Sequence, residues 1–245
     1  MAKQLTDFFL EESSYLQAYL LTVFYFLVLY FVLAPLFLWI CIQLEKKGIA
    51  FKILESTVST KSKSFEIKNS VISMLIFGLT GIIIVFFKRH NLIEIGKDSA
   101  LWTLVGVLIL TIWNEVHFFI VHRIMHLPFF YKHVHKIHHQ SKIPTVYSVY
   151  SFHWLEALLL SLVPIAVSPF INFSAPTFIL YPIASIVLNL AGHCNYRIGG
   201  GKGPLWTLFA TRHSQHHFLN RGNYGFASGI LDRWIKVMQN KIKHE

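Results

Sequence analysis

Long apolar runs, separated by short polar stretches, dominate the hydrophobic pattern of this chain. The run at 15–44 is almost unbroken, shorter runs follow at 71–87 and 100–121, and a pair of apolar segments occupies 155–170 and 176–191. The hydrocarbon core of a bilayer is about 30 Å thick, so about 20 helical residues are needed to cross it. The pattern therefore predicts an all-α fold. We expect an integral membrane helical bundle with three spanning helices, together with an apolar hairpin at about 155–191 that either crosses or enters and returns.

The polar stretch between the first two runs sets the expected orientation. It covers 45–70 and contains six lysines, Lys46, Lys47, Lys52, Lys61, Lys63 and Lys68. Basic loops tend to remain on the cytoplasmic side, so we expect this stretch there and the N-terminus outside. Following the chain through the later spans places 117–154 and 192–245 on the cytoplasmic side too, as a histidine-rich helical cap. We divide the chain into 1–112, with the N-terminal helices and basic loop, and 113–245, the histidine-box region, and expect one structural unit.

The composition agrees with a lipid environment. Hydrophobic residues make up 54% of the chain and charged residues only 14%, whereas soluble domains carry about 25% charged residues. A net charge of +10 would suggest nucleic acid in a soluble protein, but we attribute it to basic loops near anionic headgroups and expect no nucleic-acid partner. The two cysteines, Cys41 and Cys194, form no C-x-x-C pair, which argues against a disulfide framework or a zinc–thiolate site.

The histidines are the chemically informative residues. The chain has fourteen, and all but His90 lie from His117 onward. Eight of them form an H-x3-H group and two H-x-x-H-H groups: His122 and His126; His135, His138 and His139; His213, His216 and His217. Residues at i, i+3 and i+4 share one face of an α-helix, so we expect each group to aim its imidazoles at one point. Neutral imidazole suits iron, zinc, copper and nickel, and eight ligands are too many for one ion, which predicts two metals.

These boxes and their surroundings resemble the fatty acid hydroxylase / sterol desaturase superfamily, membrane enzymes with a di-iron centre held by eight to ten histidines. The likeness runs from about Trp113 to Trp234 and includes H-R-x-x-H at His122, both H-x-x-H-H boxes, Asn223-Tyr224-Gly225 and Asp232-Arg233-Trp234. The family's H-P-x-E element appears as His153-Trp154-Leu155-Glu156, with Trp154 in place of proline.

The resemblance implies further site residues. His193, after the last apolar segment, and His153 would complete a set of ten metal ligands, although His193 could instead be an interface residue and His153 could support another ligand. Glu156 and Asn223 are the expected catalytic-site residues. Glu156 would orient a ligand imidazole or merely begin a helix. Asn223 would shape a tight turn near the site together with Tyr224.

The resemblance also implies a reaction. Two iron ions, for which zinc can substitute, would use O2 and electrons from a separate donor of cytochrome b5 or ferredoxin type to hydroxylate a C–H bond of a lipid. Desaturation by the same site is the first alternative. A non-redox zinc-binding membrane protein, either a hydrolase or a transporter, is the second, although the H-E-x-x-H motif of zinc proteases is missing.

Two weaker patterns concern the substrate and the location. Aromatic residues near the boxes either line an apolar substrate groove or anchor the chain at the interface: Phe129, Phe130, Tyr147, Tyr150, Phe152, Trp206, Phe209 and Phe218. The C-terminal Lys241-Ile-Lys243-His244-Glu245 resembles a dilysine retrieval signal of the endoplasmic reticulum. A bacterial inner membrane is an equally good expectation.

Overall fold

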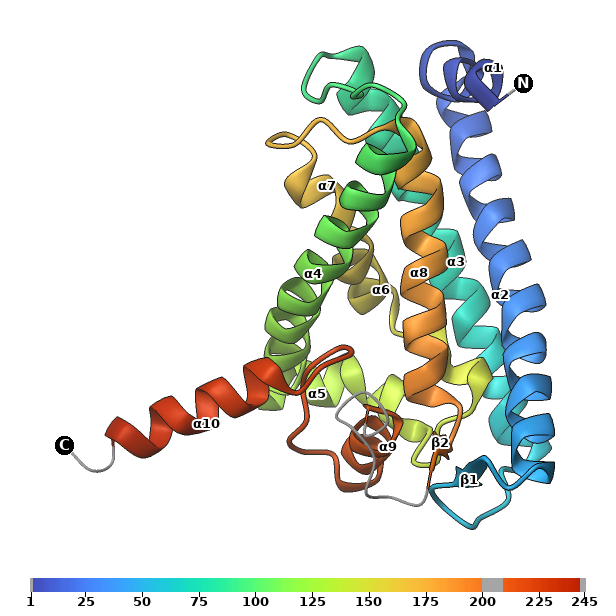
Figure 1. Ribbon diagram of the computed structural model, residues 1–245, viewed down its shortest axis with the longest axis vertical. Helices are drawn as coiled ribbons and strands as arrows, with labels where there is room; N and C mark the ends of the chain where they lie inside the picture. Colours follow the sequence, from blue (N-terminus) through green and yellow to red (C-terminus); the bar gives the residue numbers. More distant parts are fainter. Residues whose placement is uncertain (1, 200–208, 243–245) are drawn as a thin grey trace.

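The computed structural model describes residues 2–199 and 209–242. Helices dominate the fold, and a single two-stranded antiparallel sheet is present in the described part (Figure 1). In chain order the elements are α1 (Ala2–Asp7), η1 (Phe8–Glu12), α2 (Tyr15–Lys46), β1 (Ala50–Lys52), α3 (Thr60–Arg89), α4 (Ala100–Met125), α5 (Pro128–His133), η2 (His135–Gln140), η3 (Val146–Tyr150), α6 (Trp154–Ser161), α7 (Val163–Val167), α8 (Ala175–His193), β2 (Tyr196–Ile198), α9 (Phe209–Leu219) and α10 (Ile230–Ile242). Trp206 and Lys243 lie outside the described residues.

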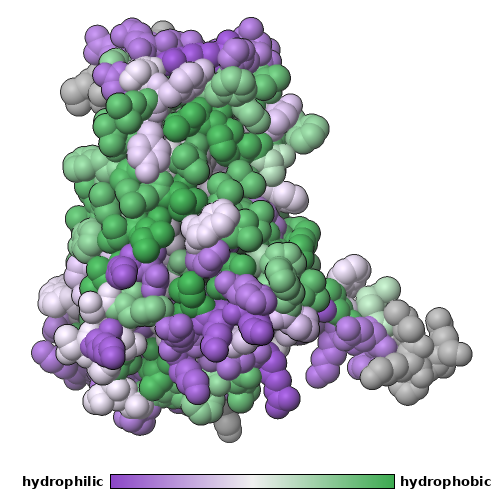
Figure 2. Space-filling model, turned by 180° about the vertical axis from the view of Figure 1, so that it is seen from behind, coloured by the Kyte–Doolittle hydropathy of each residue, from purple (hydrophilic) through white to green (hydrophobic). Residues whose placement is uncertain are grey.

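Within the described residues, four helices, α2, α3, α4 and α8, are long and apolar enough to cross a membrane. They run along the long axis of the molecule (Figure 1). Figure 2 shows an apolar band between two hydrophilic ends, as expected where side chains face lipid. The prediction of an all-α integral membrane protein with a histidine-rich helical region is confirmed.

Two helices are longer than the apolar pattern predicted. α3 begins at Thr60, where the Ser59 side chain caps it, so part of the expected polar loop is helical. The reason is that polar residues on this extension are buried against the 145–147 segment: Thr145 donates a hydrogen bond to Glu66, and Ser70 Oγ donates to the Tyr147 carbonyl at 2.9 Å. α4 continues past 121 to Met125 and so carries His122 on its last turn.

The apolar pair at 155–191 reaches the far end of the bundle. Its first limb is broken at Leu162 into α6 and α7, and its second limb is the continuous α8. The connection between the limbs is hydrogen-bonded to the α3–α4 connection, where Gly96 N donates to Phe173 O at 2.9 Å, and to the first turn of α4, where Trp102 Nε1 donates to Asn172 O at 2.9 Å. Both ends of the pair return to the histidine-rich end (Figure 1), as expected from the predicted topology.

One large apolar cluster joins the early helices to the later ones. It includes Tyr30 and Met74 from α2 and α3, Tyr150 from η3, and Ile186 from α8. The Tyr30 hydroxyl donates to the Tyr147 carbonyl at 2.8 Å within this cluster. Residues on both sides of 112 therefore share a core, which suits the expectation of one structural unit.

Candidate metal centre

Four elements meet at one end of the bundle and carry the predicted ligands. They are the end of α4, η2, the end of α8, and α9. α4 and α8 are spanning candidates that both finish at this end, while η2 and α9 lie beneath them (Figure 1). Segments up to 95 residues apart in the sequence thus bring their histidines together.

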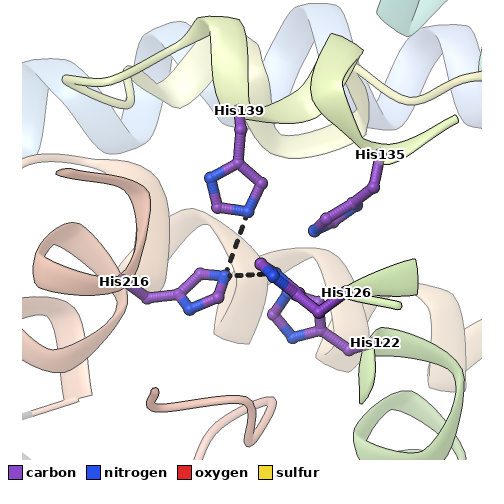
Figure 3. A group of neighbouring side chains, drawn as sticks. All are labelled: His122, His126, His135, His139 and His216. Atoms are coloured by element: carbon purple, nitrogen blue, oxygen red, sulfur yellow. Dashed lines mark hydrogen bonds between the residues drawn. The ribbon is translucent and has the colours of Figure 1, made fainter. Parts of the chain in front are cut away.

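In the part of the chain that the structure describes, nine histidines form two groups, and within each group the ligand nitrogens all lie within 4.8 Å of one another. Group one is His122, His126, His135, His139 and His216. Figure 3 shows these five rings converging on one space from three elements. Group two is His138, His193, His213 and His217. The groups adjoin, since the rings of His139 and His217 have centroids 4.9 Å apart.

The structure divides both H-x-x-H-H boxes between the two groups, so the expectation that each box aims at one point is wrong. In α9, His213 and His217 are four residues apart and nearly in line, while His216 points away from His217 into group one. The other box lies on a 3-10 helix rather than an α-helix. On a 3-10 helix, residues three apart such as His135 and His138 lie directly above one another, about 6 Å apart along the helix axis. This separation lets the two imidazoles belong to different groups.

Hydrogen bonds to surrounding acceptors fix the orientation of five rings. The Nδ1 atoms of His122 and His216 donate to the carbonyls of Tyr224 (2.9 Å) and Gly222 (2.5 Å). His135 Nδ1 donates to Glu156 Oε1 at 2.8 Å. In group two the same atoms of His138 and His193 donate to the carbonyls of Ser151 (3.3 Å) and Asn189 (2.9 Å). Each Nδ1 thus holds the proton, which leaves a lone pair on Nε2 directed into the group.

These inward nitrogens fit a cation. His216 Nε2 lies 3.2 Å from His126 Nε2 and 3.1 Å from His139 Nε2 (Figure 3). In group two, His193 Nε2 and His138 Nε2 are 3.5 Å apart although both rings carry their proton on Nδ1. Lone pairs that converge in a buried site repel each other unless a positive ion lies between them. Within the described residues, the buried Nε2 atoms of His122 and His135 have no hydrogen-bond partner, so they are available to a metal.

Electrostatics keeps the rings neutral. Burial, together with the neighbouring His216, lowers the pKa of His126 to about 3. Burial and the neighbours His216 and His126 lower the pKa of His139 to about 2. Burial lowers the pKa of His216 to about 4. A neutral imidazole is the metal-binding form, so at physiological pH these nitrogens are free to bind an ion without losing a proton.

The other three predicted site residues lie around the groups. Glu156, buried on the first turn of α6, is hydrogen-bonded to the candidate ligand His135. Asn223 Nδ2 donates to the Arg212 carbonyl at 3.3 Å and ties a turn to α9. His153 belongs to neither group: it caps α6, its Nδ1 accepting from Leu155 N at 3.2 Å.

The comparison with known proteins agrees with this arrangement. The fatty acid hydroxylase family matches residues 107–236, more than half of the chain, and the match includes every histidine of both groups. This chain belongs to the fatty acid hydroxylase family. The predictions of the family and of its enzyme class, lipid hydroxylase/desaturase-type oxidoreductases, are confirmed.

Curated relatives of this fatty acid hydroxylase family member are named for several lipids. Sphinganine C4-monooxygenase 2 of Arabidopsis thaliana is 26% identical over 217 residues, which cover 82% of this chain and 80% of the relative. Fatty acid hydroxylase domain-containing protein 2 of Homo sapiens is 31% identical over 133 residues, which cover 54% of this chain and 38% of the relative. Lathosterol oxidase of Rattus norvegicus is 28% identical over 149 residues, which cover 57% of this chain and 48% of the relative. The chain thus spans less than half of the human and rat relatives. No solved structure matches it.

Sequence reasoning missed most of the residues that hold the ligands in place. The acceptors for His122, His216, His138 and His193 are backbone carbonyls, which leave no mark on side-chain chemistry. A signal did exist for the turn at Gly222 and Asn223, because both have positive φ, 66° and 54°, and glycine and asparagine favour that conformation. The role of Asp232, which accepts from Tyr224 N (3.0 Å) and Gly225 N (2.9 Å), had no such signal.

The aromatic residues proposed to line a groove have different environments. Phe152 is buried with its ring 4.8 Å from that of His138. Tyr150 is packed in the large core cluster, and Tyr147 lies against it. Phe129 and Phe218 are 66% and 57% exposed. Phe152 therefore has direct ring contact with a histidine of group two.

Proposed function

We propose that this chain is a membrane-bound, di-iron, O2-dependent hydroxylase of a lipid C–H bond. The observation that carries the proposal is the pair of adjoining histidine groups with neutral, inward-facing Nε2 atoms, in a chain of the fatty acid hydroxylase family. Group one would hold one iron and group two the other. His153 would support the α6 start rather than bind metal.

The iron pair, when bound, would supply the oxidising power to break an unactivated C–H bond with O2. The balanced reaction takes lipid, O2, two electrons and two protons to hydroxylated lipid and water. The protein's own residues hold the site: Glu156 keeps the proton of His135 at Nδ1, and Gly222 and Tyr224 do the same for His216 and His122. Eight of the nine rings are buried and His126 is half-buried, which would limit the access of water to the reacting centre.

A lipid with an unactivated alkyl segment is the proposed substrate class. A relative that aligns over most of both chains is named a sphinganine C4-monooxygenase, which favours hydroxylation of a long-chain lipid. The relative named lathosterol oxidase supports desaturation as the second candidate, since the same site can remove a second hydrogen.

We place the metal centre on the cytoplasmic side. The lysine-rich stretch before and within the start of α3 lies at the same end of the molecule as η2 and α9 (Figure 1), and basic segments favour that side. The four apolar helices would all span the bilayer. A separate donor of cytochrome b5 or ferredoxin type would then deliver electrons from the cytoplasm, in either a bacterial inner membrane or the endoplasmic reticulum.

The test is an untargeted lipid comparison of a host with and without the chain, combined with iron analysis of the purified protein. His216→Ala removes a group-one ligand, and His90→Ala, a histidine outside both groups, is the matched control. We expect a lipid gaining one oxygen atom with the wild type and with His90→Ala, and not with His216→Ala. Two zinc ions per chain from iron-replete cells, with no lipid changed in any candidate host, would refute the proposal.

A further inference from the structure

Helix α10 projects from the body and presents two distinct faces. Figure 1 shows it leaving near α4 and running across the long axis of the molecule rather than along it. Its exposed apolar residues, Ile230, Trp234, Val237 and Met238, are 61%, 60%, 53% and 42% exposed. They recur at the i, i+4, i+7 and i+8 spacing of a single helical face. Four large apolar side chains exposed side by side on one helical face are a candidate binding surface.

The opposite face of α10 is polar and cationic. It carries Arg233, Lys236, Gln239 and Asn240, all exposed. The only acidic residue, Asp232, is turned inward, where it accepts hydrogen bonds from Tyr224 N and Gly225 N. The charge presented to the surroundings is therefore positive. In Figure 2 the hydrophilic side chains of this projecting segment lie on the side away from the apolar band.

The start of α10 is fixed at the edge of the lipid-facing surface. Glu115 on α4 accepts hydrogen bonds from Ala227 N (2.8 Å) and from Ser228 N and Oγ (3.2 and 3.1 Å to Oε1). On either side of Glu115 the same helix exposes Ile112 and Ile120, at 60% and 50%. The apolar face of α10 thus begins beside an apolar surface that belongs to a spanning helix.

We propose that α10 lies in the membrane interface, with its apolar face in the headgroup–acyl boundary and with Arg233 and Lys236 toward anionic headgroups. A helix that is apolar on one face, cationic on the other and parallel to the bilayer plane has the properties of an interfacial helix. A second copy of this chain is the competing occupant. The crosswise direction of α10 and the continuity of its apolar face with the lipid-facing side of α4 favour the bilayer.

Interfacial binding of α10 would also support the metal centre. Asp232 on its first turn holds the turn whose Gly222 and Tyr224 carbonyls orient His216 and His122. Seating the helix in the interface fixes the position of that carboxylate. The proposal itself rests on the membrane location of the chain and not on its reaction, so the two can fail separately.

The test uses the full chain in phosphatidylcholine vesicles with and without phosphatidylglycerol. A spin label is attached at Val237→Cys on the apolar face or at Gln239→Cys on the polar face, and collisions with lipid-soluble O2 and with a water-soluble nickel chelate are compared. The unsubstituted chain, whose Cys41 and Cys194 are buried, measures background labelling. A thermal-unfolding midpoint and a circular-dichroism spectrum equal to those of the unsubstituted chain show that each variant is folded.

We expect the ratio of O2 to nickel collisions to be severalfold higher at 237 than at 239, and to increase at 237 when anionic lipid is present. Lys236→Gln should weaken that increase. If the labels at 237 and 239 collided with the nickel chelate equally often, the proposal would be overturned. Spin–spin broadening at 237 that disappears on dilution with unlabelled chain would overturn it in favour of a second copy. An unchanged ratio with and without anionic lipid would overturn the headgroup assignment.

Discussion

His135 and Glu156, 21 residues apart, form a fully buried pair in which the imidazole Nδ1 donates to the carboxylate Oε1 at 2.8 Å. Glu156 Oε2 has no hydrogen-bond partner within the described residues. An isolated buried carboxylate is costly unless a positive charge lies near. A metal ion bound to His135 Nε2 would stabilise the negative charge of Glu156 through the imidazole ring. The pair is therefore suited to a site that holds a metal ion.

Replacing Glu156 should weaken metal binding without removing a ligand. Glu156→Gln keeps the shape of the side chain but loses the charge-assisted hydrogen bond, and we expect iron affinity to fall by about 10–100-fold. Iron retained against a graded chelator measures the change, with the exposed Glu55→Gln as control. A variant that kept iron as tightly as the wild type, yet lost activity, would instead assign Glu156 to the reaction.

The two groups should lose metal separately. His122→Ala removes a group-one ligand and His217→Ala a group-two ligand, so each variant should retain about half of the wild-type iron while losing the lipid product. Metal analysis together with Mössbauer spectroscopy measures which iron is lost. The exposed His133→Ala, whose Nδ1 only contacts the Phe129 carbonyl, should keep both ions. Complete loss of iron from both variants would show one interdependent cluster rather than two groups.

Asp232 should act as a positioning residue for His122 and His216. Asp232→Ala leaves the backbone amides of Tyr224 and Gly225 without their acceptor, and loss of hydrogen bonds to a charged group costs about 1.5–3 kcal/mol each, less at this half-exposed position. We expect reduced iron affinity, with product formation restored at high iron concentration. Gln239→Ala, further along the same helix, is the matched control. A purely structural role would lower the unfolding temperature without this rescue by iron.

The metal-free protein should lose stability on acidification. His126, His139 and His216 have pKa values of about 3, 2 and 4 in the folded chain, below the ordinary value of about 6.5 in the unfolded chain. Between about pH 6.5 and pH 4 the unfolded state binds more protons, so the free energy of unfolding falls as the pH falls through this window. Thermal unfolding of the chelator-treated protein at several pH values measures the effect. A midpoint independent of pH across that window would show that the rings are not buried as neutral groups.

The substitution His216→Ala gives an internal check on this pH dependence. It removes His216, whose own pKa is lowered in the folded chain. It also removes a neighbour that lowers the pKa values of His126 and His139. The metal-free variant should therefore show a shallower fall in stability between pH 6.5 and pH 4 than the metal-free wild type. An identical slope would contradict the assignment of these shifts to mutual burial of the rings.

Much of this protein followed from the sequence alone. The apolar runs predicted the spanning helices, because the thickness of a bilayer sets a length that can be read directly from the chain. Local spacing identified the eight box histidines, all of which lie in the two groups, and the resemblance added His193. Side-chain identity and local periodicity are sufficient for these statements.

Only the tertiary structure decided how the ligands are shared. His138 lies with His193 and His217, while its sequence neighbour His139 lies with His126 and His216. That division depends on the 3-10 geometry of η2 and on how α9 packs beneath α4 and α8, neither of which local periodicity determines. The same holds for His153, which caps a helix, and for the carbonyls that orient the rings. Spacing along one helix sets which side chains share a face, but only the packing of separate helices sets which faces meet.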